Sequence, residues 1–330
     1  MDGDYERLYR ETAPSVVSVY REAGRRGAGS GFVYDADHVL TNEHVVRGSD
    51  SVDVRYANAA WTTGVVVGSD SYTDLAVVQV PDRPADADPL TVADGDAAPT
   101  PGRPVAALGN PLGLDGSITT GVVSGVNRSM PTSGGFAVPD VVQTDAPIDR
   151  GNSGGPLVSA ADDGYPVVGV NRAKSGDSVG FAVSARVIAA VVPALIAEGR
   201  YRHASLGVET VDVTPRVATA NGLDTPRGVV VVGNRDGTTP LRGSRGTRRV
   251  RGTRVPVGGD VVVGFAGHDV RSHEELTRLL LTDATPGESV GLTVVRNGHE
   301  RDLTVTPTER PVTRRDRERA AGDATTIPVE

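Results

Sequence analysis

The 330-residue chain contains no cysteine and a single lysine, Lys174, and both scarcities exclude chemistry. Without a thiol there is no disulfide, no cysteine nucleophile and no cysteine-based metal site. Lys174 follows alanine rather than the glycine of a Walker A loop, which excludes ATP-driven unfolding by this chain. The six histidines are scattered without HExxH spacing, so a metalloprotease of that type is excluded as well. We expect no cofactor and no metal.

Long hydrophobic runs are also missing. Residues 1–7 have no apolar stretch behind a basic start, and the Arg25-Arg26 pair is not followed by the apolar run of a twin-arginine signal. The longest apolar stretch, residues 187–197, contains Pro193 and is too short to span a bilayer. These absences predict a soluble, cytoplasmic protein without a membrane partner.

The charged residues are unbalanced in type. Of 34 basic residues all but Lys174 are arginine, against 42 acidic residues, and the formal net charge is −8. Abundant aspartate with almost no lysine is the surface composition expected of a protein from a salt-rich cytoplasm, although a GC-rich genome would also raise arginine and aspartate. The halophilic hypothesis predicts denaturation on dialysis to low salt, and unchanged stability would reject it.

A glycine-dense turn, Gly151-Asn152-Ser153-Gly154-Gly155-Pro156, is the most informative stretch that is present. Glycine tolerates the positive φ angles and the close approach needed when backbone N–H groups must point at a substrate oxygen. Ser153 is therefore a candidate nucleophile. Upstream, Thr41-Asn42-Glu43-His44-Val45-Val46 offers a base and Thr73-Asp74-Leu75-Ala76-Val77 offers a carboxylate. The order His, Asp, Ser is the one used on chymotrypsin-like β-barrels.

With these motifs the sequence resembles the HtrA/Deg family of serine proteases, which are ATP-independent quality-control enzymes with a trypsin-like domain followed by a PDZ domain. The matching stretches follow in the family's order: Gly29-Ser30-Gly31-Phe32-Val33, 40–46, 73–77, Ala107-Leu108-Gly109-Asn110-Pro111-Leu112-Gly113-Leu114, Gln143-Thr144-Asp145-Ala146, 151–157 and Gly180-Phe181-Ala182-Val183. The resemblance implies a mostly β fold, a chymotrypsin-like double β-barrel followed by a C-terminal PDZ domain. The strand spacing alone shows only a barrel or a sandwich.

Each predicted catalytic group has a role that its chemistry suits. A serine hydroxyl is a poor nucleophile until a base removes its proton, and an imidazole, with an ordinary pKa of about 6.5, suits that task. Asp74 would accept the other ring N–H of His44 and stabilise the imidazolium. The backbone N–H groups of Gly151 and Ser153 would form the oxyanion hole, with Asn152 shaping the turn. Asp70 also precedes the strand at Leu75 and is the alternative carboxylate, unless it is only a turn residue.

The resemblance also implies a substrate pocket. Pro147 lies six residues before the nucleophile, at the base of the S1 pocket in trypsin-like enzymes, and its apolar character favours cleavage after small or medium apolar residues. Ile148 and the strand of Gly180, Phe181 and Ala182 are expected to line the pocket.

One pair departs from the family around this pocket, because Asp149-Arg150 stands where Asn-Pro is usual. Arg150 could alter how this activation loop switches. Residues 127–139 and 171–179 correspond to the loops that order it.

The chain divides near residue 200. Residues 1–200 are the predicted protease domain, with an N-terminal segment over 1–14 and a linker helix over about 184–199 that Pro193 should kink or divide. Residues 203–308 are predicted to be PDZ-like, and 309–330 a charged, disordered tail. The strands predicted for the first domain are 15–20, 31–34, 51–56, 63–67, 75–80, 105–108, 118–126, 141–144 and 167–172.

In the second domain, Ser205-Leu206-Gly207-Val208 corresponds to the family's carboxylate-binding loop, whose N–H groups would capture peptide C-termini. Ser272 and Glu275 form a capping box before a helix, and Asn297-Gly298 predicts a type I′ hairpin.

Residues 234–257 depart from the PDZ pattern, because glycine and arginine this dense will not make a stable helix. The simplest interpretation is a mobile, solvated loop. A cationic lip for acidic clients is an alternative, and a nucleic-acid contact is the least favoured because no aromatic residue is interleaved.

The resemblance further implies a homotrimer. Tyr5, Tyr9 and residues 12–17 look like the family's N-terminal trimerisation segment, unless the two tyrosines merely pack on their own barrel.

The favoured function is a serine endopeptidase that degrades unfolded or damaged proteins through an acyl-enzyme on Ser153. A different class is a PDZ-containing chaperone or binding protein whose proteolysis is incidental or silent. A third is a nucleic-acid-associated protein that works through its arginine loop.

Overall fold

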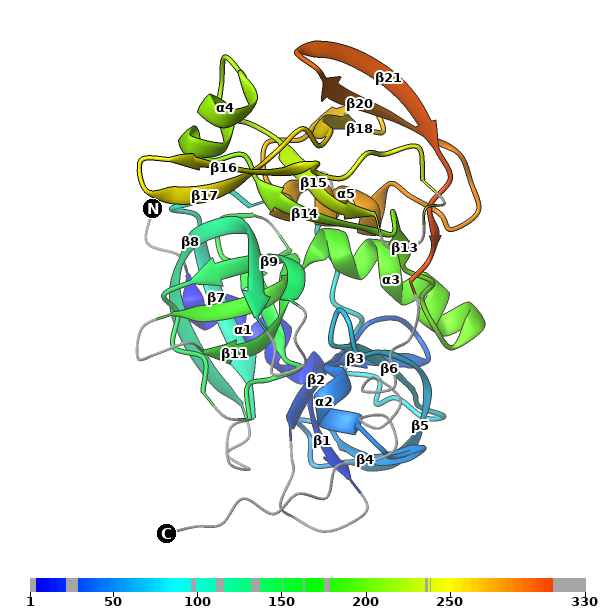
Figure 1. The fold of residues 1–330 in the computed structure, drawn as a ribbon. Coiled ribbons are helices and arrows are strands. Elements are labelled where there is room, and N and C mark those ends of the chain that lie inside the picture. Colours follow the sequence, from blue (N-terminus) through cyan, green and yellow to red (C-terminus); the bar gives the residue numbers. More distant parts are fainter. Residues whose placement is uncertain are drawn as a thin grey trace, which may run out of the picture. The chain divides into compact units, whose positions relative to one another are not determined.

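The computed structural model describes residues 4–21, 29–95, 99–110, 116–131, 137–149, 151–162, 164–174, 179–234, 237 and 239–310. These residues form two compact units, of which one ends at Tyr201 and the other begins at Arg202 (Figure 1). In this part of the chain no helix is both long and apolar enough to cross a bilayer.

Six strands of the first unit close into a barrel in the order β1-β2-β3-β6-β5-β4. They are β1 Val16–Arg21, β2 Gly29–Val33, β3 His38–Thr41, β4 Ser51–Arg55, β5 Trp61–Asp70 and β6 Leu75–Gln79. Alternation of valine with polar residues forms such strands, as in β4, where Val52 and Val54 are buried while their neighbours are half-buried. The inward valines share one hydrophobic core.

Six further strands close a second barrel in the order β10-β11-β12-β9-β8-β7. They are β7 Pro104–Gly109, β8 Ser117–Pro131, β9 Ala137–Thr144, β10 Pro156–Ser159, β11 Val167–Lys174 and β12 Gly180–Ser184. Two closed six-stranded barrels in one unit confirm the predicted mostly β, chymotrypsin-like double barrel.

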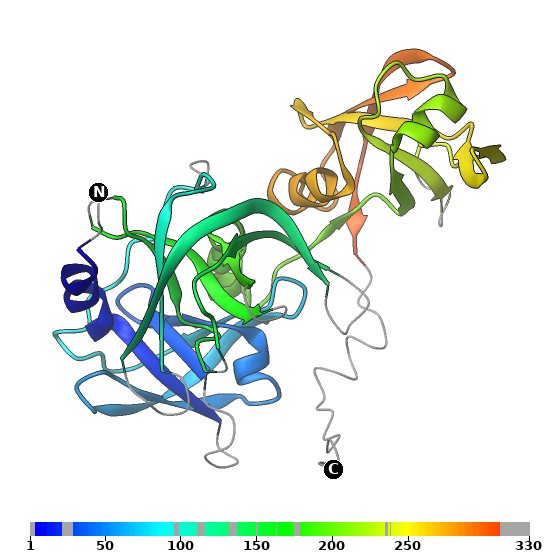
Figure 2. The same ribbon diagram turned by 90° about the vertical axis from the view of Figure 1, so that its left-hand side faces the viewer.

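Strands β8 and β9 form a long, curved pair (Figure 2). The register shifts between Val123 and Gly125, and twice more before Met130, and such irregularities bend a strand. The predicted loop 127–139 therefore begins and ends within strands, and its residues 132–136 lie outside the described residues.

Helices flank the barrels. The bounds are α1 Tyr5–Thr12, the 3₁₀ turn η1 Ala13–Ser15, α2 Glu43–Val46 and α3 Ala185–Glu198. Helix α1 begins at Asp4, whose side chain accepts from the backbone N–H of Arg7, and it buries Leu8. A methyl group at Gly116 would lie 2.2 Å from the hydroxyl of Tyr9, so this tyrosine packs on its own unit.

The linker helix is present but is not divided at Pro193. Ser184 caps its start, and Gly199 ends it with a φ of 73°. Pro193 lacks the N–H that would reach the carbonyl of Ala189, and both residues lie on the exposed face. Water can therefore satisfy that carbonyl, and the helix continues.

The second unit is built on a sheet in the order β14-β15-β18-β20-β21, with β19 beside β18. Its elements are β13 Ala204–Ser205, β14 Val208–Asp212, α4 Pro215–Asn221, β15 Val229–Asn234, β16 Gly246–Val250, β17 Thr253–Val257, β18 Val261–Phe265, β19 His268–Asp269, α5 His273–Thr282, β20 Val290–Arg296, β21 His299–Val305 and β22 Thr308–Glu309. Ser272 caps α5, and Asn297-Gly298 turns the β20–β21 hairpin with positive φ at both residues, as predicted. Glu309, predicted to begin the disordered tail, pairs instead with Ala204.

The arginine- and glycine-rich segment is not a simple loop, which corrects the favoured interpretation. β16 and β17 pair over five positions, and Arg251-Gly252 makes a two-residue turn with positive φ at both residues. Val255 is buried, and Val250 and Val257 pack against the same core cluster, so apolar residues anchor a hairpin that is otherwise exposed.

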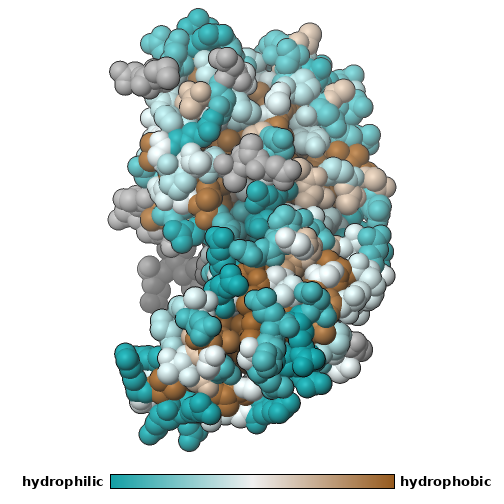
Figure 3. All heavy atoms as spheres, turned by 90° about the horizontal axis from the view of Figure 1, so that it is seen from above, coloured by the Kyte–Doolittle hydropathy of each residue, from teal (hydrophilic) through white to brown (hydrophobic). Residues whose placement is uncertain are grey.

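The molecular face in Figure 3 is mostly hydrophilic, with hydrophobic residues in small patches.

Candidate active site

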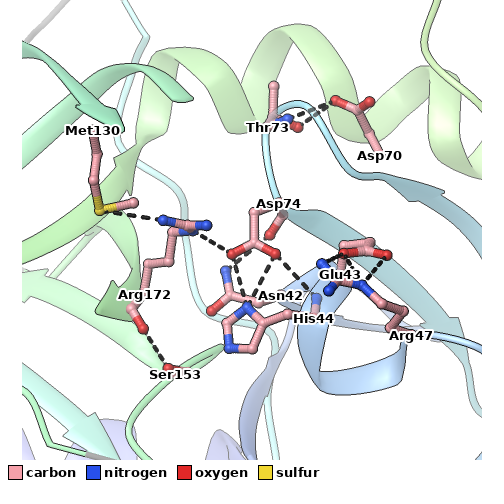
Figure 4. A network of polar contacts seen from close by, with 10 residues as sticks. All are labelled: Asn42, Glu43, His44, Arg47, Asp70, Thr73, Asp74, Met130, Ser153 and Arg172. Atoms are coloured by element: carbon pink, nitrogen blue, oxygen red, sulfur yellow. Dashed lines mark hydrogen bonds and ion pairs between the residues drawn. The ribbon is translucent and has the colours of Figure 1, made fainter. Parts of the chain in front are cut away.

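His44 and Asp74 form a hydrogen-bonded pair (Figure 4). The Nδ1 atom of His44 lies 2.9 and 3.0 Å from the two carboxylate oxygens of Asp74, and the backbone N–H of His44 donates to the same carboxylate at 3.0 Å. A carboxylate only accepts, so Nδ1 carries the proton and Nε2 is left with a lone pair. That tautomer is the one a general base needs.

The backbone of Asp74 is held in a strained conformation. Its φ is 60°, in the left-handed region that residues other than glycine seldom adopt. Its carbonyl accepts from the side-chain amide of Asn42 at 2.9 Å and from the backbone N–H of Glu43 at 3.1 Å. These bonds join the start of α2 to the start of β6 and fix the carboxylate beside the ring.

The Asp74 carboxyl is buried, with 2% of the residue exposed. Burial alone would raise its pKa, but the charge and hydrogen bond of His44 and the guanidinium of Arg172 outweigh burial. The pKa of Asp74 therefore lies below its ordinary value, and the group is ionised at neutral pH. The alternative carboxylate, Asp70, accepts instead from the backbone N–H and the hydroxyl of Thr73.

Glycine is required in the turn around Ser153. Gly151 and Gly154 have φ of 103° and 88°. A methyl group at Gly154 would lie 2.0 Å from the carbonyl oxygen of Ser30, and one at Gly155 would lie 2.2 Å from that of Leu108. The turn thus lies directly against strands of both barrels.

Ser30, on β2, ties this turn to the first barrel. Its backbone N–H donates to the carbonyl of Ser153 at 2.8 Å, and its hydroxyl donates to the carbonyl of Gly151 at 2.6 Å. From β11, Asn171 holds the other side, because its carbonyl accepts from the N–H of Gly154 at 2.8 Å. The turn is fixed from two directions.

The hydroxyl of Ser153 does not reach the imidazole. It donates to the carbonyl of Arg172 (Figure 4), and within the described residues no hydrogen bond joins it to His44. Of the three predicted catalytic side chains, the structure therefore pairs His44 with Asp74 and leaves Ser153 on a different acceptor.

Both backbone N–H groups predicted to form the oxyanion hole lack a hydrogen-bond acceptor in the described part of the chain. Within the described residues the backbone N–H groups of Gly151 and Ser153 have no acceptor, whereas that of Asn152 donates to the carbonyl of Asp149 at 3.1 Å. Asn152 itself is buried, in keeping with a residue that shapes the turn. Arg150, predicted to influence switching, lies outside the described residues.

The predicted pocket residues lie near one another but differ in exposure. Pro147 is exposed, and Ile148 and Ala182 belong to the core of the second barrel. Gly180 lies against Ile148, since a methyl group there would approach its Cδ1 to 2.8 Å. Phe181 is half-buried on the other face of β12. Their role in substrate preference stays a prediction.

The predicted carboxylate loop lies between β13 and β14. Leu206 is buried in the core of the second unit, Gly207 has a φ of 66°, and the hydroxyl of Ser205 accepts from the N–H of Gly207 at 3.2 Å. Val208 begins β14, which lies at one edge of the sheet. Peptide binding here also stays a prediction.

Arg172 and Ser30 are functional candidates that the sequence reasoning missed. Ser30 belongs to the motif of residues 29–33, but nothing in the spacing signals that its hydroxyl reaches Gly151, 121 residues away. Arg172 follows Asn171 in a strand, and only the folded chain shows that its guanidinium reaches Asp74.

The chain is similar to known proteins over most of its length. Residues 29–170 match the family model described as trypsin-like peptidase domain. "Protease Do-like 1, chloroplastic" from Arabidopsis thaliana is 32% identical, and the match covers 92% of this chain and 72% of that relative's length. The solved structure of "HtrA-type protease AlgW with tripeptide" has a TM-score of 0.73 and 31% identity, covering 93% of this chain and 98% of that one. The chain belongs to the HtrA family of serine proteases.

Another relative of this HtrA protein is a "Probable periplasmic serine endoprotease DegP-like" from Halomonas elongata, 36% identical over 91% of the chain. The chain spans about 60% of that relative's length. Three further relatives carry the same periplasmic name, which contradicts the cytoplasmic location expected from the sequence. That expectation was wrong because it was based only on the absence of a signal pattern, and such an absence does not indicate where a protein is located.

Proposed function

We propose that this HtrA protein is an ATP-independent serine endopeptidase that degrades unfolded or damaged proteins. The observation that carries the proposal is the hydrogen bond from His44 Nδ1 to the buried, ionised Asp74. Ser153 lies on the glycine turn nearby. Its hydroxyl donates to the carbonyl of Arg172, and the guanidinium of Arg172 contacts Asp74. The periplasmic names of its relatives support action outside the cytoplasm.

In the proposed reaction, Ser153 leaves the carbonyl of Arg172 and rotates toward Nε2 of His44. The imidazole takes the hydroxyl proton as Oγ attacks the substrate carbonyl, and Asp74 stabilises the resulting imidazolium. The N–H groups of Gly151 and Ser153 receive the oxyanion. His44 then returns the proton to the leaving amine, and water hydrolyses the acyl-enzyme by the same steps.

Several finer features belong to the same proposal. Pro147 favours small or medium apolar residues before the scissile bond. The second unit acts as a PDZ domain that receives peptide C-termini at Ser205–Val208, beside the edge strand β14. The chain assembles as a homotrimer through its N-terminal segment.

The test is digestion of a permanently unfolded protein and of a peptide library, with Ser153→Ala as control. We expect cleavage after valine- or alanine-like residues by the wild type without ATP, and none by the variant. Cleavage after arginine or lysine would contradict the pocket assignment, and equal cleavage by the variant would contradict the nucleophile.

A binding protein with silent proteolysis is the second candidate, and the bond from Ser153 to Arg172 favours it, because that hydroxyl is not activated. It predicts that Ser153→Ala suppresses aggregation of unfolded clients as well as the wild type, and that no unfolded substrate is cut by either.

A further inference from the structure

Arg172 touches both halves of the candidate active site. Its Nε donates to Oδ2 of Asp74 at 2.5 Å, and its carbonyl accepts from Ser153 Oγ (Figure 4). We propose that Arg172 is a positioning residue of the peptidase: its guanidinium limits how strongly Asp74 stabilises the imidazolium of His44, and its carbonyl holds Ser153 at rest. This inference rests on the proposed function.

The contact is a buried ion pair between the two barrels. The side chains of Arg172 and Asp74 are only 16% and 3% exposed. Arg172 lies on β11 of the second barrel, and its other end, Nη1, lies 3.2 Å from the sulfur of Met130 on β8. A guanidinium enclosed in this way acts on Asp74 with little screening by water.

Other charged groups near the pair are already engaged. Arg47, which follows α2, has its Nη2 2.6 Å from a carboxylate oxygen of Glu43, whose charge compensates it. Asp70 is bound to Thr73. Arg172 differs because its countercharge is Asp74 itself.

The sign of the effect follows from this arrangement. A positive charge on one carboxylate oxygen weakens the negative potential at the imidazole, so protonating the ring becomes harder. With Arg172 present, the ring therefore stays neutral and able to act as a base at lower pH than without it. The carbonyl of the same residue keeps Ser153 Oγ off that base until a substrate or a loop movement displaces it.

The test is the pH profile of kcat/KM for the wild type, Arg172→Met, Arg172→Lys and Arg47→Met. We expect the acid limb of Arg172→Met to move to higher pH by on the order of one pH unit. Arg172→Lys keeps the charge and should stay close to the wild type, and Arg47→Met should move less. An unmoved acid limb in Arg172→Met, or an equal move in Arg172→Lys, would overturn the inference.

A second readout does not need activity. In the Ser153→Ala background, NMR signals of the His44 ring, assigned with His44→Ala, should respond to acid at higher pH when Arg172 is Met. If the wild type cleaves nothing, the proposed function fails while this measurement still decides the role of Arg172. Ring signals that ignore the substitution would refute it.

An independent observation concerns the second unit. A cavity of about 390 Å³ lies between α4, the β16–β17 hairpin and the β20–β21 turn, and four arginines line it: Arg242, Arg245, Arg248 and Arg296. None of the described residues that line it is acidic. Arg296 is bound to Asp260 at 2.7 Å and Arg248 to the carbonyl of Ala220 at 2.9 Å. The guanidinium groups of Arg242 and Arg245 have no acceptor in the described part of the chain.

We infer that this cavity binds an acidic peptide segment. Two guanidinium groups without acceptors suit carboxylates, and Leu223, Val257 and Val295 in the wall suit the aliphatic stems of glutamate. Aromatic residues that would stack bases are missing from the described lining, which disfavours nucleic acid.

The test is fluorescence anisotropy of a labelled glutamate-rich peptide with the full-length Ser153→Ala protein. Replacing both Arg242 and Arg245 by Gln should weaken binding about tenfold or more. Arg216→Gln, which changes an arginine bound to Thr253 outside the cavity, should leave it unchanged. Equal binding by the double variant, or tighter binding of a single-stranded DNA oligonucleotide, would overturn the inference.

Discussion

The two barrels hold their predicted catalytic side chains in different ways. In the first barrel His44 and Asp74 are already joined by side-chain and backbone bonds, and the base is in the required tautomer. In the second barrel the turn is hydrogen-bonded to Ser30 and Asn171, yet the hydroxyl of Ser153 is bonded to Arg172. The predicted base is therefore already hydrogen-bonded to its carboxylate, whereas the predicted nucleophile is held on a different acceptor.

Removing the predicted nucleophile or the predicted base should have the largest effect on activity. In both Ser153→Ala and His44→Ala, we expect peptide hydrolysis to fall about a millionfold, because the acyl-enzyme cannot form without either group. Steady-state hydrolysis of a fluorogenic peptide measures this. Additive losses in the double variant would contradict a shared step.

Changing only the carboxylate of the first barrel should reduce activity less. In Asp74→Asn the amide cannot hold the ring in the same tautomer, and kcat should fall about ten-thousandfold. Labelling of Ser153 by a fluorophosphonate should slow in parallel. A loss smaller than tenfold would show that the His44–Asp74 pair is not the working base.

Changing the glycine turn of the second barrel should lower the free energy of unfolding. Gly154→Ala places a methyl group 2.0 Å from Ser30 O and should cost at least about 2 kcal/mol in the free energy of unfolding. Gly48→Ala is the matched control, since Gly48 has a φ of 75° with open space around it, and about 1 kcal/mol is expected. Urea unfolding measures both, and equal costs would show that the turn is not tightly held.

The smallest effect concerns acid. Because the pKa of Asp74 is lowered on folding, the pair stabilises the fold above the unfolded value of about 4, and that stability is lost as pH falls through the lower folded pKa. Unfolding of Asp74→Asn should therefore depend less steeply on pH in that range. A parallel slope for the two proteins would contradict the lowered pKa.

Local patterns predicted much of this architecture. The valine alternation of β4, the capping box at Ser272 and the Asn297-Gly298 turn depend on neighbours in sequence, and each is present in the structure. The pairing of His44 with Asp74 was expected as well.

What sequence could not predict depends on distant contacts. The short helix α2 that carries His44 was not predicted, because hydrogen bonds to the backbone carbonyl of the distant Asp74 fix its start. The β16–β17 hairpin forms because its valines find a core supplied by other elements. The acceptor of Ser153 could not be predicted, because it depends on which backbone carbonyl the fold brings close to the hydroxyl. In the structure that carbonyl belongs to Arg172.

Whether Ser153 is a nucleophile activated by His44 is best tested by mass spectrometry of the protein after reaction with a fluorophosphonate. We expect one adduct, on the peptide that contains Ser153, and none in His44→Ala. An adduct on another residue, or equal labelling of Ser153 without His44, would contradict it.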